Sequence, residues 1–424
     1  MKKILYVVLD GLGDRPNPLL QNKTPLEAAK TPNMDSLAAG GKLGILYTVG
    51  KNIAPESDVA VISLLGYDAH KYYTGRGPLE AYAEGLDLRD GDVAFRVNFA
   101  TVDGKKIMDR RVGRNLSSEE AKALAAEIQE KVKLTSRKAQ FWFKSTIGHR
   151  GILVIRSLEG KLSGNISNTD PAYGKEGVFG VAKEKFENFV LSCEPLDNSK
   201  QTQDAAVLSN EFVEKSTKVL EESEVNKKRK QEGKLIGNVI LMRDAGDRLP
   251  KFPSIESVYN VKFSSFVEMP VERGIALLSG MQVVDMPQPT ADAKKDFEVR
   301  ANMALKKIPE FDGLYIHLKG PDEPAHDGNV EKKLKSIEDI DAFFFGNLLP
   351  KLNLKDVIIT VTADHSTPCA IKAHSADPVP LLIAGGNIAP DGINTFSEAS
   401  CKTGTLGGRF GNELMKTLVE FAKE

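Results

Sequence analysis

The stretch Ile4-Leu-Tyr-Val-Val-Leu-Asp10 is a continuous apolar run, rich in β-branched residues, that ends abruptly in an aspartate. Two later stretches follow the same pattern, Gly313-Leu-Tyr-Ile-His-Leu-Lys-Gly-Pro-Asp322 and Val357-Ile-Ile-Thr-Val-Thr-Ala-Asp-His365. Continuous apolar runs of this length are typical of strands buried on both faces, as in a parallel sheet covered by helices. The three stretches therefore predict the central strands of one sheet.

Helical segments are expected between and after these strands, at residues 292–308, 330–345 and 411–423. The alternation predicts an α/β fold in which helices cover both faces of the sheet. In such sheets, ligands bind beyond the carboxyl ends of the strands, where all three acidic tails fall. One aspartate at a strand end is equally well explained as a turn residue, but three together favour a functional site.

The middle of the chain is more charged than the rest and contains two strong helix patterns. Ser117 and Glu120 form a capping box at the start of the first, and the second is a long amphipathic pattern at residues 211–232. We expect a discontinuous α/β domain of residues 1–80 and 250–424, with an inserted α+β domain of residues 81–249.

Composition excludes several classes of partner. The chain has 57 basic and 58 acidic residues, so its net charge of -1 does not favour binding to nucleic acid or to an anionic membrane. No segment approaches the roughly 18 apolar residues that span a bilayer, and the first apolar run meets Asp10 too soon for a signal peptide. Three scattered cysteines suit a reducing compartment. We expect a cytoplasmic protein, and the sequence leaves open whether it forms a homo-oligomer.

Aspartates and histidines follow the ends of the three predicted strands. They are Asp10, Asp322, His326, Asp364, His365 and His374. A single Asp–His pair forms a structural hydrogen bond more often than it binds a metal, but this many together favours a metal site. A mixed set of carboxylates and imidazoles suits Mn²⁺, Mg²⁺, Co²⁺ or Zn²⁺. Adjacent ligands at a strand tip, such as Asp364 and His365, can face two neighbouring ions.

Ser57 is the candidate nucleophile. The apolar spacing after it is helical, which places Ser57 at or near a helix N-terminus. A serine there is most often an N-cap, but the backbone N–H groups and the helix dipole also stabilise an alkoxide or a phosphate. Two divalent ions bring four positive charges and the three aspartates bring three negative ones. A deprotonated Ser57 would therefore make the site neutral.

Longer motifs extend along nearly the whole chain. They include Val8-Leu-Asp-Gly-Leu-Gly-Asp-Arg15, Thr24-Pro-Leu-Glu-Ala-Ala-Lys-Thr-Pro-Asn33, Glu56-Ser-Asp58, Tyr73-Thr-Gly-Arg-Gly-Pro-Leu-Glu80, Lys319-Gly-Pro-Asp-Glu-Pro-Ala-His-Asp-Gly328, Thr362-Ala-Asp-His-Ser-Thr-Pro368 and His374-Ser-Ala-Asp-Pro-Val-Pro380. In these motifs the sequence resembles the archaeal-type 2,3-bisphosphoglycerate-independent phosphoglycerate mutases of the alkaline phosphatase superfamily. The resemblance implies an alkaline-phosphatase-like sheet with helices on both faces and an inserted α+β cap domain.

The resemblance also implies an activity, the interconversion of 3-phosphoglycerate and 2-phosphoglycerate in glycolysis and gluconeogenesis. A phosphoserine on Ser57 would be the intermediate, with two divalent ions, Mn²⁺ first among them, and no 2,3-bisphosphoglycerate. One metal would be held by Asp322, His326 and His374, and the other by Asp10, Ser57, Asp364 and His365. The residues implied for substrate binding are Arg76, Asn98, Arg150, Asp170, Asn238, Arg243 and Lys319.

Two stretches of the insert depart from the family pattern. Arg243-Asp-Ala-Gly246 stands where the family has Arg-Gly-Ala-Gly, and Asn168-Thr-Asp-Pro-Ala172 lacks the histidine of Asp-x-Asp-Pro-His. Both departures concern substrate contacts rather than phosphoryl transfer. The alternatives are a metal-dependent phosphomonoesterase or phosphopentomutase of the same superfamily, and a metal-bound protein without catalysis. The large insert favours a mutase, which needs a lid that excludes water.

Overall fold

The computed structural model describes residues 1–176, 179–183, 185–287, 289–290 and 292–424. The chain forms two compact units, the first comprising Met1–Tyr72 and Lys251–Glu424 and the second comprising Tyr73–Pro250. The second unit is thus one insertion into the first. It begins before the expected boundary at residue 81, because α5 (Arg76–Ala83) packs on strands of the second unit.

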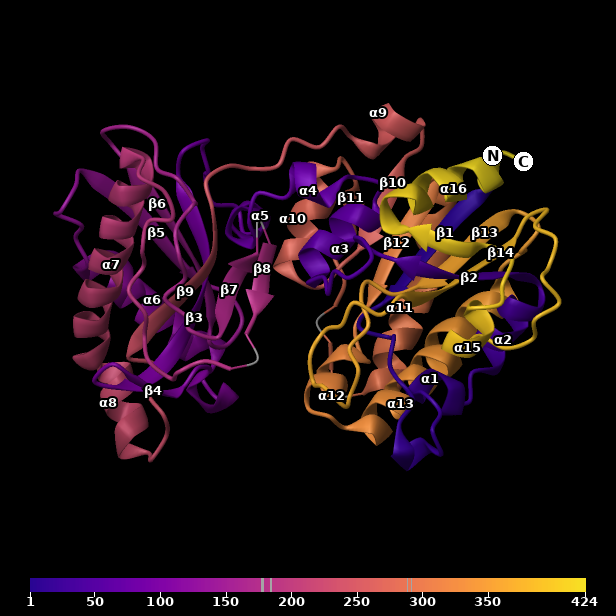
Figure 1. Ribbon diagram of the computed structural model, residues 1–424, viewed down its shortest axis with the longest axis horizontal. Coiled ribbons are helices and arrows are strands. Elements are labelled where there is room, and N and C mark those ends of the chain that lie inside the picture. Colours follow the sequence, from indigo (N-terminus) through magenta and orange to yellow (C-terminus); the bar gives the residue numbers. More distant parts are fainter. Residues whose placement is uncertain (177–178, 184, 288, 291) are drawn as a thin grey trace. The chain divides into compact units, whose positions relative to one another are not determined.

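An eight-stranded sheet forms the centre of the first unit (Figure 1). Its order is β11-β10-β12-β1-β13-β14-β2-β15. The strands are β1 (Lys3–Leu9), β2 (Gly41–Tyr47), β10 (Phe263–Phe266), β11 (Gln282–Val283), β12 (Gly313–Leu318), β13 (Val357–Thr362), β14 (Val379–Gly385) and β15 (Gly407–Phe410). The three apolar runs form β12, β1 and β13, which are parallel neighbours. All residues from Ile4 to Leu9 are buried, as predicted for a strand with both faces covered.

Helices cover both faces of this sheet. In Figure 1, α3, α10 and α16 pack together on one face, and α1, α2, α11 and α13 lie on the other. The helices of the unit are α1 (Pro25–Ala28), α2 (Pro32–Ala39), α3 (Ser57–Leu64), α4 (Ala69–Tyr72), α9 (Ile255–Tyr259), α10 (Pro270–Leu278), α11 (Ala293–Lys307), α12 (Asp322–His326), α13 (Val330–Asp339), α14 (Gly346–Leu348), α15 (Glu398–Cys401) and α16 (Gly411–Lys423). The expected helix at 330–345 continues past α13 as a π-helical turn, Ile340–Phe345. This arrangement confirms the predicted α/β class.

The second unit is an α+β structure built on a five-stranded sheet. Its order is β4-β3-β6-β5, with β9 paired to β3. The strands are β3 (Val93–Asp103), β4 (Lys106–Asp109), β5 (Ala139–Ser145), β6 (Arg150–Ser157) and β9 (Val239–Gly246), and a separate hairpin joins β7 (Tyr173–Glu176) to β8 (Phe179–Ala182). The rings of Phe99, Phe143 and Phe212 pack in sequence, with centroids 5.7 Å apart at each step, and join the sheet to its helices.

Helices α6 (Ser118–Lys131), α7 (Lys200–Glu221) and α8 (Glu224–Gln231) complete the second unit. The predicted capping box at Ser117 is present, with reciprocal hydrogen bonds to Glu120. The prediction of a single helix at residues 211–232 is wrong. The chain leaves the helical conformation at Ser223, whose buried hydroxyl donates to Glu127, so α7 and α8 are separate.

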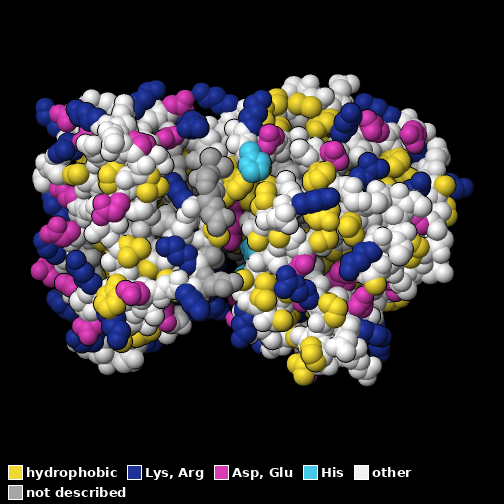
Figure 2. All heavy atoms as spheres, viewed as in Figure 1, with side chains coloured by type: hydrophobic (Ala, Val, Ile, Leu, Met, Phe, Trp, Pro, Cys, Tyr) yellow, Lys and Arg dark blue, Asp and Glu magenta, His cyan; other side chains and the backbone are white. Residues whose placement is uncertain are grey.

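The surface carries the balanced charge that the composition implies. Figure 2 shows basic and acidic side chains mixed over the visible face of each unit, in keeping with the net charge of -1. In the described part of the chain, every helix is too short or too polar to cross a membrane.

A buried lysine fixes the loops that follow β1 and β13. Lys333 Nζ donates to Asp14 Oδ2 at 2.9 Å and to the carbonyl oxygens of Gly13 and Thr367 at 3.0 Å. Asp14 also accepts a hydrogen bond from the backbone N–H of Cys369. These contacts hold together the two loops that begin with the strand-end acidic residues.

Replacing Lys333 with methionine tests this clamp. The change keeps most of the side-chain volume but leaves the buried Asp14 carboxylate without its cation, which typically costs about 3–5 kcal/mol of unfolding free energy. We expect a melting temperature roughly 10 °C lower, measured by circular dichroism. The double variant Lys333→Met/Asp14→Asn also removes the negative charge and should recover part of the loss. Unchanged melting of Lys333→Met would show that the clamp does not stabilise the unit.

Candidate active site

Three adjacent strand ends place the acidic residues of the first unit together. Asp10 directly follows β1, Asp322 begins α12 after β12, and the pair Asp364 and His365 follows β13. Because β12, β1 and β13 are parallel neighbours, these residues meet at one edge of the sheet. Asp10 is 6% exposed, Asp364 is fully buried and His365 is 1% exposed, so little solvent reaches their charges.

His365 contacts most of the other groups in this cluster. Its Nε2 lies 3.2 Å from Asp364 Oδ2, 3.5 Å from Asp10 Oδ1 and 3.2 Å from Ser57 Oγ. Asp10, Asp364 and His365 each offer a ligand atom, and these atoms lie within 4.8 Å of one another. The structure therefore brings together the four residues that the resemblance implies for one metal.

Asp322, His326 and His374 form the second group. His326 Nε2 lies 3.4 Å from Asp322 Oδ2 and 3.2 Å from His374 Nε2, and His374 Nε2 is 3.7 Å from Asp322 Oδ1. The His374 ring also stacks on His365 with centroids 3.6 Å apart, so the two groups are contiguous. Asp322, His365 and His374 also have ligand atoms close enough to share one ion.

Ser57 is the first residue of α3, and Glu56, in an extended conformation, occupies the N-cap position. The sequence left open that Ser57 is the N-cap of this helix, and the structure shows that it is not. Its hydroxyl instead faces the His365 imidazole at the N-terminus of a helix, where the dipole and the free N–H groups favour negative charge. Glu56 Oε1 also lies 3.7 Å from His374 Nδ1, which connects this turn to the second group.

The electrostatics of the cluster fit a cation-binding site. Burial raises the pKa of Asp10 to about 7; Lys319 opposes this shift, and Asp364 and Asp322 add to it. Burial also disfavours ionised Asp364, but His365 and His317 hold the pKa of Asp364 well below its ordinary range. Within the described residues, Asp10 Oδ1 and Asp364 Oδ2 are buried and have no hydrogen-bond partner. Unpaired carboxylate oxygens beside imidazole nitrogens suit a divalent metal ion.

The residues implied for substrate binding fall into three groups. Arg76, Asn98, Arg150, Asp170 and Arg243 lie in the second unit. Asn238 is also in that unit, but its amide is engaged by the backbone N–H and C=O of Val102. Lys319 lies in the first unit, where its Nζ is 2.9 Å from Asp10 Oδ2, so it belongs to the carboxylate cluster rather than to the arginines.

The second unit contains a cluster of buried and half-buried arginines, one of which, Arg96, was not predicted from the sequence. Arg96 lies opposite Arg243 across strands β3 and β9, and shares Glu80 with Arg76. Burial and the neighbouring Arg76 and Arg243 lower the pKa of Arg96 to about 9. Its Nε has no hydrogen-bond partner among the described residues. Arg96 could have been predicted from the sequence, because residues two apart in a strand lie on the same face and Asn98 was already in the predicted set.

Asp170 and Tyr173 hold one side of this arginine cluster. Arg110 makes a bidentate contact with Asp170 at 2.9 and 2.7 Å, and Arg243 lies 3.5 Å from the same carboxylate. The Arg243 guanidinium also stacks over the Tyr173 ring at 3.8 Å. Planar guanidinium groups held in this way are suited to bind a carboxylate or a phosphate.

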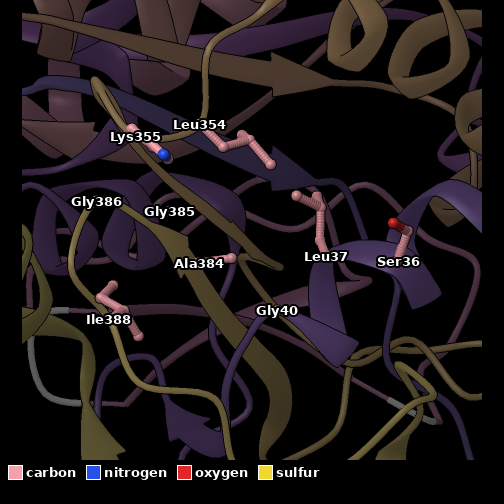
Figure 3. A pocket seen from close by; sticks show the side chains of 9 residues that line it. All are labelled: Ser36, Leu37, Gly40, Leu354, Lys355, Ala384, Gly385, Gly386 and Ile388. Atoms are coloured by element: carbon pink, nitrogen blue, oxygen red, sulfur yellow. The ribbon is translucent and has the colours of Figure 1, made fainter.

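The pocket in Figure 3 lies elsewhere on the first unit. It has a volume of about 200 Å³ and is lined by Ser36, Leu37, Gly40, Leu354, Lys355, Ala384, Gly385, Gly386 and Ile388. Leu354 and Lys355 precede β13, so the pocket is at the opposite end of that strand from Asp364. Its lining is mainly apolar side chains and glycines and does not resemble a catalytic site.

Comparison with known proteins assigns the family. A family model described as 2,3-bisphosphoglycerate-independent phosphoglycerate mutase matches residues 38–226. A protein of that name from Aeropyrum pernix is 44% identical over 415 residues, which are 96% of this chain and 96% of that protein. The chain belongs to this family of isomerases. The resemblance found in the sequence motifs is thereby confirmed.

Further relatives agree with this assignment. A protein of the same name from Thermococcus gammatolerans is 38% identical over 421 residues, covering 99% of this enzyme and 97% of the relative. The solved structure of a cofactor-independent phosphoglycerate mutase from Thermoplasma acidophilum has a TM-score of 0.63 at 32% identity and covers 100% of both chains. A Pyrococcus horikoshii protein of known structure has a TM-score of 0.80 at 30% identity, covering 100% of this chain and 97% of that one.

The half-buried His149 provides a test of anion binding by the arginines. Burial, together with Arg150, Arg111 and other nearby arginines, lowers the pKa of His149 to about 4. A bound anion would offset these positive charges, so inorganic phosphate should raise this pKa. Protonation of His149 and binding of the anion then favour each other, so His149 should contribute to phosphate binding below its raised pKa and down to about 4.

The measurement is an NMR titration of the His149 ring protons, assigned by their loss in His149→Gln. Arg96→Gln provides the control, because removing one cation should raise the pKa of His149 without any phosphate. A His149 titration that phosphate leaves unchanged would contradict anion binding by this cluster.

Proposed function

We propose that this enzyme interconverts 3-phosphoglycerate and 2-phosphoglycerate through a phosphoserine on Ser57. The names of its relatives support the substrate. The observation that supports the chemistry is the position of Ser57 Oγ, 3.2 Å from His365 Nε2 beside buried carboxylates. A hydroxyl in that position at a helix N-terminus is suited to become a nucleophile.

The proposed metal ligands are the two contiguous groups of the first unit. One divalent ion would be held by Asp322, His326 and His374, and the other by Asp10, Ser57, Asp364 and His365. When bound, such ions lower the pKa of a ligated hydroxyl and neutralise charge on a phosphoryl group. Mn²⁺ is the first candidate, and Mg²⁺, Co²⁺ and Zn²⁺ suit the same ligands.

In the proposed reaction, the Ser57 hydroxyl loses its proton and Oγ forms a bond to phosphorus, while the bond from phosphorus to the C3 oxygen of the glycerate breaks. The C3 oxygen takes up a proton, and the glycerate reorients. Its C2 hydroxyl then loses a proton and attacks the phosphoserine, and Ser57 Oγ leaves and takes up a proton. The arginines of the second unit would hold the glycerate carboxylate, with Asn98 and Asp170 as polar neighbours.

One of the two departures from the family pattern, Asp244, adds a negative charge beside this arginine cluster. Asp244 has a φ of 56°, a left-handed conformation that favours the glycine found there in the family. Its carboxylate lies 3.4 Å from Arg243 Nε and partly neutralises that arginine. We therefore propose that Arg76, Arg96 and Arg150 contribute more to substrate binding here than Arg243 does.

One assay separates the mutase from a phosphomonoesterase. Given Mn²⁺ and 3-phosphoglycerate without 2,3-bisphosphoglycerate, the enzyme should produce 2-phosphoglycerate, and Ser57→Ala should reduce turnover to background. Ser63→Ala is the matched control, because Ser63 is a buried residue of the same helix and should keep activity. Free phosphate and glycerate as the main products would favour the phosphatase. Mutase turnover in a folded Ser57→Ala protein would show that Ser57 is not the nucleophile.

Metal content provides an independent test. His326→Ala and His365→Ala should each lower the number of bound Mn²⁺ ions from two per chain towards one, measured by elemental analysis. Each should also reduce the rate by about 10³-fold or more, because charge stabilisation at the phosphoryl group would be lost. His70→Ala, on the exposed face of α4, serves as the control. Two ions per chain in both histidine variants would disprove the proposed ligands.

A further inference from the structure

Glu272 and His317 are buried, ionisable and unused by the proposed mechanism. Each is 1% exposed, Glu272 on α10 and His317 on β12. Glu272 Oε1 lies 3.6 Å from His317 Nδ1, and His317 Nε2 lies 3.5 Å from Asp364 Oδ2. The imidazole therefore stands between two carboxylates, one of which belongs to the proposed metal site.

Strand alternation explains how this contact arises. Tyr315, His317 and Lys319 alternate with apolar residues along and just beyond β12, so they point to the same face of the sheet. Glu272 contacts two of these three side chains from α10. The Tyr315 hydroxyl lies 3.5 Å from His317 Nδ1 on the same face.

The same carboxylate oxygen of Glu272, Oε1, also contacts Lys319. Lys319 Nζ lies 2.5 Å from Glu272 Oε1 and 2.9 Å from Asp10 Oδ2. Glu272 thus holds both an imidazole that faces Asp364 and an ammonium group that faces Asp10. These two aspartates belong to the same proposed metal site.

Packing alone does not explain why Glu272 and His317 are buried. Buried charged pairs are often no more stable than apolar pairs of similar volume, so packing alone does not explain them. Among the described residues, Glu272 Oε2 and His317 Nε2 also have no hydrogen-bond partner. Groups behind metal ligands orient those ligands and tune the metal.

We propose that Glu272 is a positioning residue for the metal site formed by Asp10, Asp364 and His365, and that it acts through His317 and Lys319. This inference rests on the proposed metal-dependent function. It is specific to one of the two sites. In the described part of the chain, the hydrogen bonds and ion pairs of Glu272 and His317 reach none of Asp322, His326 and His374.

The test uses two full-length proteins in which one proposed site is disabled. His326→Ala leaves the site of Asp10, Asp364 and His365, and His365→Ala leaves the other. Mn²⁺ affinity is measured by titration calorimetry, without substrate. Adding Glu272→Gln should weaken Mn²⁺ binding roughly 10- to 100-fold in the His326→Ala protein. In the His365→Ala protein the affinity should stay within about twofold, because Glu272 does not reach that site.

Two further variants keep the result interpretable. His317→Gln should show the same selective loss, and it replaces Glu272→Gln if the latter does not fold. Glu268→Gln is the matched control, because Glu268 lies just before α10 and pairs with Arg300 at 2.8 Å. It should leave Mn²⁺ affinity unchanged in both proteins.

The outcomes separate this inference from the proposed function. If the parent enzyme binds no Mn²⁺, the proposed metal centre fails and the inference fails with it. If the parent binds two ions and Glu272→Gln and His317→Gln change neither affinity, only the positioning role is overturned. Equal losses in both site-disabled proteins would indicate a general loss of stability and would also overturn it.

Discussion

The parallel pairing of β1 with both β12 and β13 is the constraint on which the rest of the structure depends. In register, Val8 lies beside His317 on one neighbour and Thr362 on the other, so the three strands end at nearly the same level. Each strand is buried on both faces, and its acidic residue therefore stands beyond its carboxyl end. Asp10, Asp322 and Asp364 meet there because the apolar runs that precede them must pack side by side.

This convergence creates an electrostatic problem that the surrounding residues only partly resolve. The buried Asp10 and Asp364 lie together with the half-buried Asp322, and the mutual repulsion of the three carboxylates disfavours their ionised forms. The imidazole of His365 and the ammonium of Lys319 offset part of that charge. Asp10 Oδ1 and Asp364 Oδ2, which have no hydrogen-bond partner among the described residues, favour a bound cation. This also explains why histidines rather than further lysines surround the site, since neutral imidazole can ligate a metal and an ammonium cannot.

The sequence was sufficient to predict the three central strands and the strand-end cluster, because both depend on local patterns. The apolar runs indicate buried strands. Asp364 and His365 are adjacent in the chain, so their proximity is evident from the sequence. Contacts between distant segments were not predictable in this way. Glu272 is an ordinary acidic residue of a helix until α10 packs on β12, and the amide of Asn238 pairs with Val102 of a distant strand. Arg96 was predictable from strand alternation, but its surroundings depend on α5, which packs on β3, and on β9, which pairs with β3.

The two units concentrate side chains of opposite charge. The first unit concentrates carboxylates, which repel an anion unless cations intervene, whereas the second concentrates arginines that attract one. Arg243 is already engaged by Asp170 and Asp244, and Arg96 shares the single carboxylate of Glu80 with Arg76. Among the described residues, the excess of positive over negative charge therefore lies towards Arg96. An anionic ligand of the second unit should therefore be drawn to that part of the arginine cluster.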